Sequence, residues 1–273
     1  MKYNIGCIGC GNMGGALVRA LAKTLPGNEI AVCDKHPEKT EALKKECGVV
    51  VTTADDIARH AKFVMLGVKP QVLVASLNEI KELLLSRSDV ILVSMAASVS
   101  IDEILHEMMG EFVIGPCSVQ VIRMMPNTPV SLGEGVIEFA CRNVDDIDKK
   151  EFCRIFDKAG LLDEISEEKI DAASALSGCG PAFVYLFAEA LSDGAVACGL
   201  PRDKAIRYAA KTLIGAGRMI EEYGHLSDLK DAVCSPGGTT IQGVRALENG
   251  AVRSAAMNAV IAAYEKTLSL QNK

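Results

Sequence analysis

The stretch Gly9-Cys10-Gly11-Asn12-Met13-Gly14 decides the fold of this chain, because it joins a predicted strand at residues 4–8 to a predicted helix at residues 12–25. Glycines at this spacing let a backbone approach a pyrophosphate closely, and the N-terminus of the following helix favours its negative charge. The alternative is a tight strand-to-helix turn that binds no ligand. The strand before the motif and the helix after it favour a dinucleotide-binding loop.

Strands and helices continue to alternate through the first half of the chain. Predicted strands occupy residues 30–33, 49–51, 63–67, 90–94, 119–124, 135–141 and 161–165. Predicted helices occupy residues 37–47, 54–60 and 71–85, and a later helix has Asp145 as its N-cap and Gly160 as its stop. Such alternation predicts crossover connections and a mostly parallel sheet.

Beyond residue 165 the strand pattern vanishes, and residues 182–198, 202–223 and 240–270 read as helices. The first of these is apolar around nearly its whole circumference, which predicts burial on all sides. One chain offers too little cover for it, so a second subunit is expected to complete the core. We therefore predict an α/β Rossmann-like domain at residues 1–165 and an all-α dimerisation domain at residues 166–273.

Composition limits the function classes. The 273 residues are 49% hydrophobic, which excludes a disordered chain. The 29 basic and 35 acidic side chains give a net charge of -6 with no basic block, so neither nucleic acid nor an anionic membrane is expected as a partner. Mean hydropathy is +0.22, but no uncharged apolar run reaches the roughly 18 residues of a spanning helix. A soluble protein is expected.

The ten cysteines are scattered singly, mostly in apolar surroundings, which predicts reduced thiols in a cytoplasm. Cys7 and Cys10 form a C-x-x-C, but no second pair or nearby histidine completes a zinc set, and no metal site is predicted. The first twenty residues loosely mimic a secretory signal. Asn4, Asn12 and five glycines make a poor apolar segment, so we interpret them as part of the fold.

Asp34 closes the second predicted strand, twenty residues after Gly14. A carboxylate there usually accepts a hydrogen bond from the ribose 2′-hydroxyl and would repel a 2′-phosphate. Lys35 and His36 follow at once and could offset that repulsion, or they could belong to a solvated turn. The choice between NADH and NADPH is therefore open.

Two further loops end neighbouring strands. Val68-Lys69-Pro70 follows the strand at residues 63–67, and Ala96-Ala97 follows the strand at residues 90–94. Ligands of such sheets bind outside the carboxyl ends of the strands, so both loops are expected to contact the cofactor. Ordinary loop chemistry is the alternative for each.

The segment Ser235-Pro236-Gly237-Gly238-Thr239-Thr240 directly precedes the last predicted helix. Two glycines at a helix N-terminus leave backbone N–H groups free beside a positive dipole end, which suits a carboxylate. An ordinary N-cap and entry loop would need one Ser or Thr rather than Gly-Gly-Thr-Thr.

In these motifs the chain resembles the pyrroline-5-carboxylate reductases. The resemblance adds Ala96 to Val99, Arg123-Met124-Met125-Pro126-Asn127-Thr128-Pro129, Ser177-Gly178-Cys179-Gly180-Pro181-Ala182 and Gly199-Leu200-Pro201-Arg202, in unchanged order. It runs from residue 5 to about residue 250 and implies reduction of 1-pyrroline-5-carboxylate to L-proline by NADPH or NADH, in a dimer or a higher homo-oligomer.

The resemblance also implies roles for individual residues. Thr240 is expected to bond the imine nitrogen as the catalytic hydroxyl. The backbone of Gly237, Gly238 and Thr239 is expected to bind the substrate carboxylate, and Glu167 matches a substrate contact. A protonated cyclic imine is already electrophilic, so orientation, an anion site and one proton route suffice.

Two rival functions stay open. A β-hydroxyacid dehydrogenase shares the domain plan but needs a lysine on the helix after its G-x-G segment; Val184 stands four residues beyond Gly180, and no lysine follows before Lys204. The other rival is a non-catalytic cofactor-binding regulator, which the intact Gly-Gly-Thr-Thr loop disfavours. His225, in a loop after Gly224, is interpreted as a surface histidine rather than a catalytic one.

Overall fold

The computed structural model describes residues 1–110 and 119–271. The chain divides into two compact units: the first comprises Met1–Cys179 and Tyr264–Lys273, and the second comprises Gly180–Ala263. The sequence predicts a boundary between residues 165 and 166, and the strands end and the helices begin there. The assignment of coenzyme binding to the part before it and dimerisation to the part after it stays a prediction.

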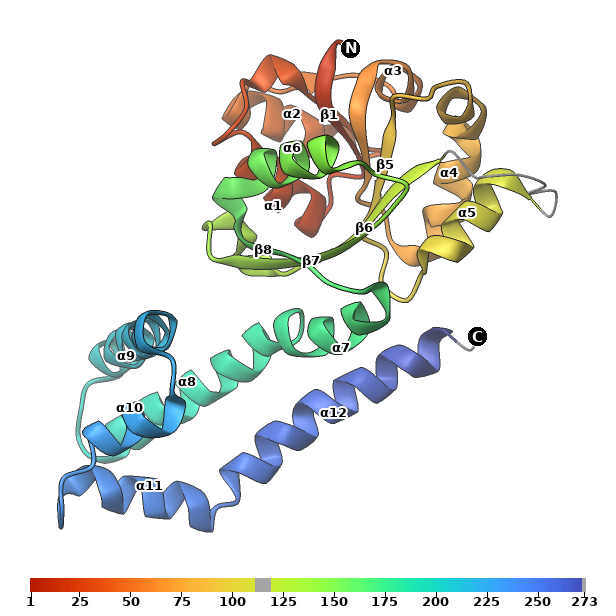
Figure 1. The fold of residues 1–273 in the computed structure, drawn as a ribbon. Helices are drawn as coiled ribbons and strands as arrows, with labels where there is room; N and C mark the ends of the chain where they lie inside the picture. The colour runs from red at the N-terminus through yellow and green to blue at the C-terminus, as the bar shows by residue number, and fades with distance from the viewer. Residues whose placement is uncertain (111–118, 272–273) are drawn as a thin grey trace. The chain divides into compact units, whose positions relative to one another are not determined.

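The first unit is built on one eight-stranded sheet in the order β3-β2-β1-β4-β5-β6-β7-β8 (Figure 1). All neighbours pair in parallel except β6 and β7, which are antiparallel. The predicted mostly parallel sheet is therefore confirmed. The strands are β1 (Tyr3–Ile8), β2 (Ile30–Cys33), β3 (Val50–Val51), β4 (Ala61–Leu66), β5 (Ile91–Ser94), β6 (Gln120–Pro126), β7 (Gly135–Arg142) and β8 (Gly160–Glu164).

Helices cover both faces of this sheet, because alternate residues of its central strands are apolar on both sides. In β4, Phe63 and Met65 pack in one core and Val64 and Leu66 in the other. The first core includes side chains of α1 (Asn12–Leu21), α2 (Pro37–Cys47) and α6 (Asp146–Phe156). The second includes those of α3 (Ala54–His60), α4 (Pro70–Leu85), α5 (Ile101–Met109) and α7 (Glu167–Ser177).

Local signals predicted several helix ends correctly. Helix α2 spans the predicted residues and ends at Gly48, whose φ of 69° suits glycine. The Asp145 side chain caps α6 by accepting from the Asp148 N–H. That helix ends at Phe156 and passes into a 3-10 turn, Asp157–Ala159, rather than running to Gly160. Helix α1 likewise ends at Leu21, four residues before the predicted end.

Three helices were not predicted: α5, α7 and α10 (Leu226–Ala232). The single helix expected at residues 240–270 is two helices, α11 (Thr239–Asn249) and α12 (Val252–Gln271). They are separated at Gly250 and Ala251, and Ala251 has a φ of 54°, which a continuous helix does not allow. The apolar pattern alone does not reveal such a break.

The second unit consists of helices, beginning with α8 (Gly180–Ala197) and α9 (Arg202–Tyr223). The sequence predicts that one chain cannot cover the first of these, and in the single chain it is largely exposed: Ser192 is its only buried residue, and Tyr185 and Leu186 are 64% and 68% exposed. Within the described residues, one stretch, Glu167–Ala197, is long and apolar enough to cross a membrane by length and composition alone. It contains Glu189 and Asp193.

Candidate active site

Three glycines hold the loops after β1 and β4 against each other. Gly9 has a φ of 98°, its N–H donates to the Cys33 carbonyl at 2.8 Å, and the Gly67 N–H donates to the Ile8 carbonyl at 2.8 Å. A Cβ on Gly14 would lie 2.1 Å from the Gly9 carbonyl oxygen, and one on Gly67 would lie 2.3 Å from it. Because these contacts are with backbone, no larger side chain fits at either position.

The surroundings of Gly11 differ from those of Gly14 and Gly67. A Cβ built there would meet no atom of the chain within 4 Å, so internal packing does not demand glycine. Gly11 is the N-cap of α1, and no side chain caps that helix. The first N–H groups of α1 therefore open toward a space that a ligand backbone or phosphate can approach, which fits a dinucleotide pyrophosphate.

A cavity of about 460 Å³ opens at the carboxyl ends of four strands, β1, β4, β5 and β6. It is lined by Gly11, Asn12, Met13, Lys39, Gly67, Val68, Lys69, Met95, Met125 and Pro126. The structure thus brings together the two loops predicted to contact the cofactor after β1 and β4. The parallel strands explain this, because their carboxyl ends share one edge of the sheet.

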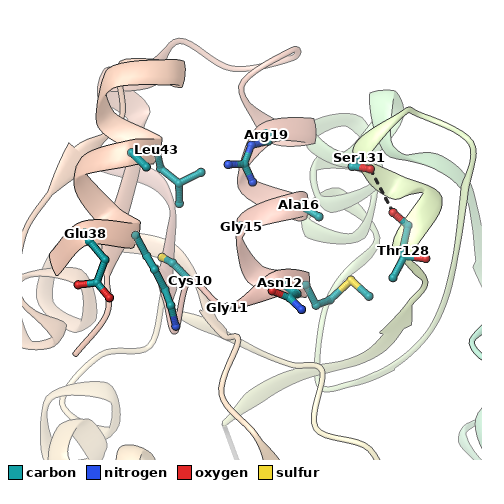
Figure 2. A pocket seen from close by; sticks show the side chains of 13 residues that line it. Cys10, Gly11, Asn12, Gly15, Ala16, Arg19, Glu38, Leu43, Thr128 and Ser131 are labelled. Atoms are coloured by element: carbon teal, nitrogen blue, oxygen red, sulfur yellow. Dashed lines mark hydrogen bonds between the residues drawn. The ribbon is translucent and has the colours of Figure 1, made fainter. Parts of the chain in front are cut away.

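A neighbouring cavity of about 550 Å³ lies against α1 and α2 (Figure 2). Gly15, Ala16 and Arg19 of α1 line it opposite Glu38 and Leu43 of α2. Gly11, Asn12, Met13 and Lys39 line both cavities. The glycine-rich loop therefore stands at the junction of the two spaces.

Asp34 follows β2, and its carboxylate points at the glycine-rich loop. Oδ2 accepts from the Cys10 N–H at 2.7 Å and Oδ1 from the His36 N–H at 2.9 Å. The ammonium of Lys39 lies 4.0 Å from Oδ1, and only 7% of the Asp34 side chain is exposed. Both carboxylate oxygens are thus already bonded to the protein.

The other predicted cofactor residues differ in their placement. Pro70 is the first residue of α4, and Lys35 is exposed without lining either cavity. Ala96 is buried in the second core and Ala97 is exposed, and neither lines the cavities; Met95 does. Lys39 was missed by sequence reasoning, although its place in the first turn of the helix after β2 is a usable signal.

Cys7 and Cys10 are free thiols, 0% and 4% exposed. The Cys7 thiol donates to the Gly9 carbonyl at 3.4 Å and the Cys10 thiol to the Cys33 carbonyl at 3.7 Å. Interaction with the Cys10 thiol, together with burial, raises the pKa of Cys7 well above its ordinary value, and interaction with Cys7 lowers the pKa of Cys10. In the described parts of the chain no group of three or more His, Cys, Asp or Glu side chains is arranged to hold a metal ion.

Arg123 of β6 forms a buried ion cluster with α7, and its side chain is 2% exposed. Nη2 donates to Asp171 Oδ1 at 2.7 Å, and Nη1 donates to Glu167 Oε1 at 3.3 Å. The same Glu167 oxygen accepts from the Ile101 N–H at 2.6 Å, at the start of α5. Glu167, the predicted substrate contact, therefore ties three elements of the first unit together.

The loop before α11, predicted to bind a carboxylate, ends at a helix N-terminus without a side-chain cap. Gly237 has a φ of 70°, and a Cβ on Gly238 would lie 2.6 Å from the Ser235 hydroxyl oxygen. Gly238 is the N-cap of α11, and no side chain caps the helix. Thr239 and Thr240 are its first two residues, and both are exposed. Their N–H groups are available to an anion at the positive end of the helix dipole.

Two family models match separate parts of the chain. One, described as pyrroline-5-carboxylate reductase dimerisation, matches residues 167–270. The other, described as NADP oxidoreductase coenzyme F420-dependent, matches residues 4–98, which include the glycine-rich loop and β4.

Whole-chain relatives agree with these matches. Pyrroline-5-carboxylate reductase 3 of Danio rerio is 38% identical, with 100% of this chain and 93% of the relative covered. Among solved structures, the pyrroline-5-carboxylate reductase of Coxiella burnetii has a TM-score of 0.88 at 32% identity, covering 99% of each chain. The Plasmodium falciparum pyrroline carboxylate reductase, with NADP bound, has a TM-score of 0.84 at 33% identity, also covering 99% of each chain.

Sheet, glycine-rich loop and adjoining cavities define a dinucleotide-binding oxidoreductase of the α/β class. Within that class, full-length relatives and the dimerisation model settle the family. The chain belongs to the pyrroline-5-carboxylate reductases.

Proposed function

We propose that the chain reduces 1-pyrroline-5-carboxylate to L-proline with NADPH or NADH, the final step of proline biosynthesis. Family membership over the whole chain carries this proposal. The loop around Thr240 supports the proposal independently, since a glycine N-cap and two exposed threonines suit a small ring that carries a carboxylate. A β-hydroxyacid dehydrogenase remains disfavoured by Val184.

The coenzyme is proposed to lie along the glycine-rich loop. Backbone groups from Gly9 to Gly14 would hold the pyrophosphate, and the open space at Gly11 fits such a ligand. Val68, Lys69 and Pro70 would flank the coenzyme at the carboxyl end of β4. At the carboxyl end of β5, Met95 lines the cavity, and the predicted contacts Ala96 and Ala97 directly follow it. When bound, the coenzyme supplies a hydride to the imine carbon.

The substrate is proposed to bind at α11. The backbone of Gly237, Gly238 and Thr239 would hold its carboxylate, with the Gly238 N–H already donating to the Ser235 carbonyl at 3.0 Å. The Thr240 hydroxyl would bond the ring nitrogen as the proton moves. Since Oε1 of Glu167 is already held by Ile101 and Arg123, any contact of that residue with substrate would use Oε2. The proposed assignment gives residues 1–165 to the coenzyme and 166–273 to substrate and dimerisation.

The test is coenzyme oxidation by the purified protein. We expect NADPH and NADH to be consumed only when 1-pyrroline-5-carboxylate is added, with proline formed in equal amount. In the control, a β-hydroxyacid replaces the imine, and the oxidised coenzyme replaces the reduced one. Binding of coenzyme without turnover of the imine would instead favour the non-catalytic regulator, and turnover of the hydroxyacid alone would favour the dehydrogenase.

We further propose a homodimer as the minimum folded unit. A model for dimerisation covers residues 167–270, and α8 exposes Val184, Tyr185 and Leu186 in the single chain. Exposed apolar area of this kind is costly in water and stabilises an assembly when a second copy covers it.

Sedimentation at micromolar concentration should therefore show a dimer or a larger homo-oligomer. Leu186→Asp is expected to reduce association, because a charge would enter the covered surface. The matched control is Ile147→Asp on α6, where the side chain is 75% exposed and outside the dimerisation region. Wild-type protein that sediments as a folded monomer contradicts the proposal.

We propose a cytoplasmic location because the cysteines are free thiols. The nine cysteines in the described part of the chain are all free, including the buried Cys7 and Cys10. Free buried thiols suit a reducing compartment.

A further inference from the structure

The geometry around Asp34 points to separate roles for Asp34 and Lys39 in coenzyme recognition. A carboxylate that selects NADH accepts a hydrogen bond from the ribose 2′-hydroxyl, so its oxygens must be reachable from that side. Here Oδ2 is bonded to the Cys10 N–H and Oδ1 to the His36 N–H, and the side chain is only 7% exposed. These bonds fasten the end of β2 to the glycine-rich loop, whichever coenzyme is bound.

The negative charge of Asp34 is also balanced. The Lys39 ammonium lies 4.0 Å from Oδ1. An ion pair at this distance reduces the repulsion that Asp34 would exert on a nearby phosphate. Asp34 thus lacks both features, exposure and an uncompensated charge, by which it would exclude NADPH.

Arg19, Lys39 and Lys69 are the cations that line the two cavities, and of these only Lys39 follows β2 and lines both. Its side chain is 41% exposed and lines both cavities beside the glycine-rich loop. Arg19, which also lines one of them, donates from Nε to both oxygens of Glu46 at 2.9 and 2.8 Å. Glu38 is the acidic residue that lines the cavity against α1 and α2, and the imidazole of His36 lies 3.6 Å from its carboxylate.

We propose that Asp34 is a positioning residue that holds the glycine-rich loop, that Lys39 binds the coenzyme's 2′-phosphate, and that the chain consequently prefers NADPH to NADH. The proposal rests on the proposed function, since it concerns the coenzyme of the same reaction. It also departs from the sequence-based expectation that the Asp34 carboxylate would repel a 2′-phosphate.

The experiment measures the Kd of NADPH and of NADH separately, by titration without substrate. Lys39→Ala should weaken NADPH binding roughly 10-fold, the loss typical of a charge-assisted hydrogen bond, and should leave NADH almost unchanged. The NADPH effect should shrink at high salt, which screens an exposed cation. The matched control is Lys45→Ala, which removes the same charge from the same helix and lines neither cavity.

Asp34→Asn and Asp34→Ala should weaken both coenzymes by a similar factor. Amide hydrogen exchange of the coenzyme-free protein should become faster in the peptide containing Cys10, while exchange in the α9 peptide stays unchanged. Faster exchange confined to that loop separates positioning from a general loss of stability. If the alanine variant fails to fold, the asparagine variant, which keeps the side-chain size, answers the same question.

Two results would overturn the inference: tighter NADPH binding after loss of Asp34, or equal weakening of both coenzymes in Lys39→Ala. Wild-type protein that prefers NADH would overturn it as well. Each of these leaves imine reduction intact, so the proposed function stands. Wild-type protein that binds neither coenzyme would overturn both.

Discussion

Replacing Thr240 with alanine is expected to lower kcat by about 10²-fold or more while changing the KM for the imine little. The hydroxyl is proposed to assist protonation of the ring nitrogen during hydride transfer, and proton-transfer groups contribute effects of this size. Alanine keeps the backbone donors of Gly237 to Thr239, so carboxylate binding should survive. A loss confined mainly to kcat marks an interaction made in the transition state.

The structure sharpens this prediction, because Gly238 rather than a threonine is the N-cap of α11 and no side chain caps that helix. Loss of the Thr240 hydroxyl should therefore cost the helix no capping bond, and the unfolding midpoint should stay near that of wild type. Thr240→Ser should keep much of the activity. Thr239→Ala, one residue away, removes a hydroxyl with no proposed role and should leave kcat within a few-fold. Wild-type kcat in Thr240→Ala would mean that the proton comes from water or another group.

The second large effect concerns stability. Arg123→Met should lower the free energy of unfolding by about 3–5 kcal/mol, the usual cost of removing one partner from a buried ion pair. The methionine fills most of the volume, but it leaves the buried Asp171 carboxylate and Glu167 without the guanidinium. Urea unfolding at one fixed protein concentration measures the change, since association also affects stability.

A second substitution tests the cause. Arg123→Met combined with Asp171→Leu removes both buried charges and should recover much of the lost stability. The matched control is Arg142→Met on β7, whose guanidinium pairs with Asp102 at 3.1 Å but is 44% exposed. That surface pair should be worth about 0–1 kcal/mol. Equal losses in Arg123→Met and Arg142→Met would contradict the assigned role of burial.

Much of the first unit was predictable, because its signals are local. The β1–α1 loop, the α2 stop at Gly48 and the Asp145 cap are each determined by a few adjacent residues. Helix α7 was not predictable in this way, since its weak amphipathic pattern gains stability from Arg123 on β6, some fifty residues earlier in the chain. The break at Ala251 was missed because the apolar pattern continues across it, although Asn249-Gly250 directly before it is a turn signal.

The candidate site shows the same division. Sequence alone determined the glycines of the glycine-rich loop and of the Gly-Gly-Thr-Thr segment, and from them predicted binding chemistry, because backbone conformation and free N–H groups depend on residue type and near neighbours. Only the tertiary structure shows which groups lie beside Asp34, Glu167 and Lys39. A charged side chain acts through whatever lies within a few ångströms of it, and those partners come from distant elements that only folding brings together.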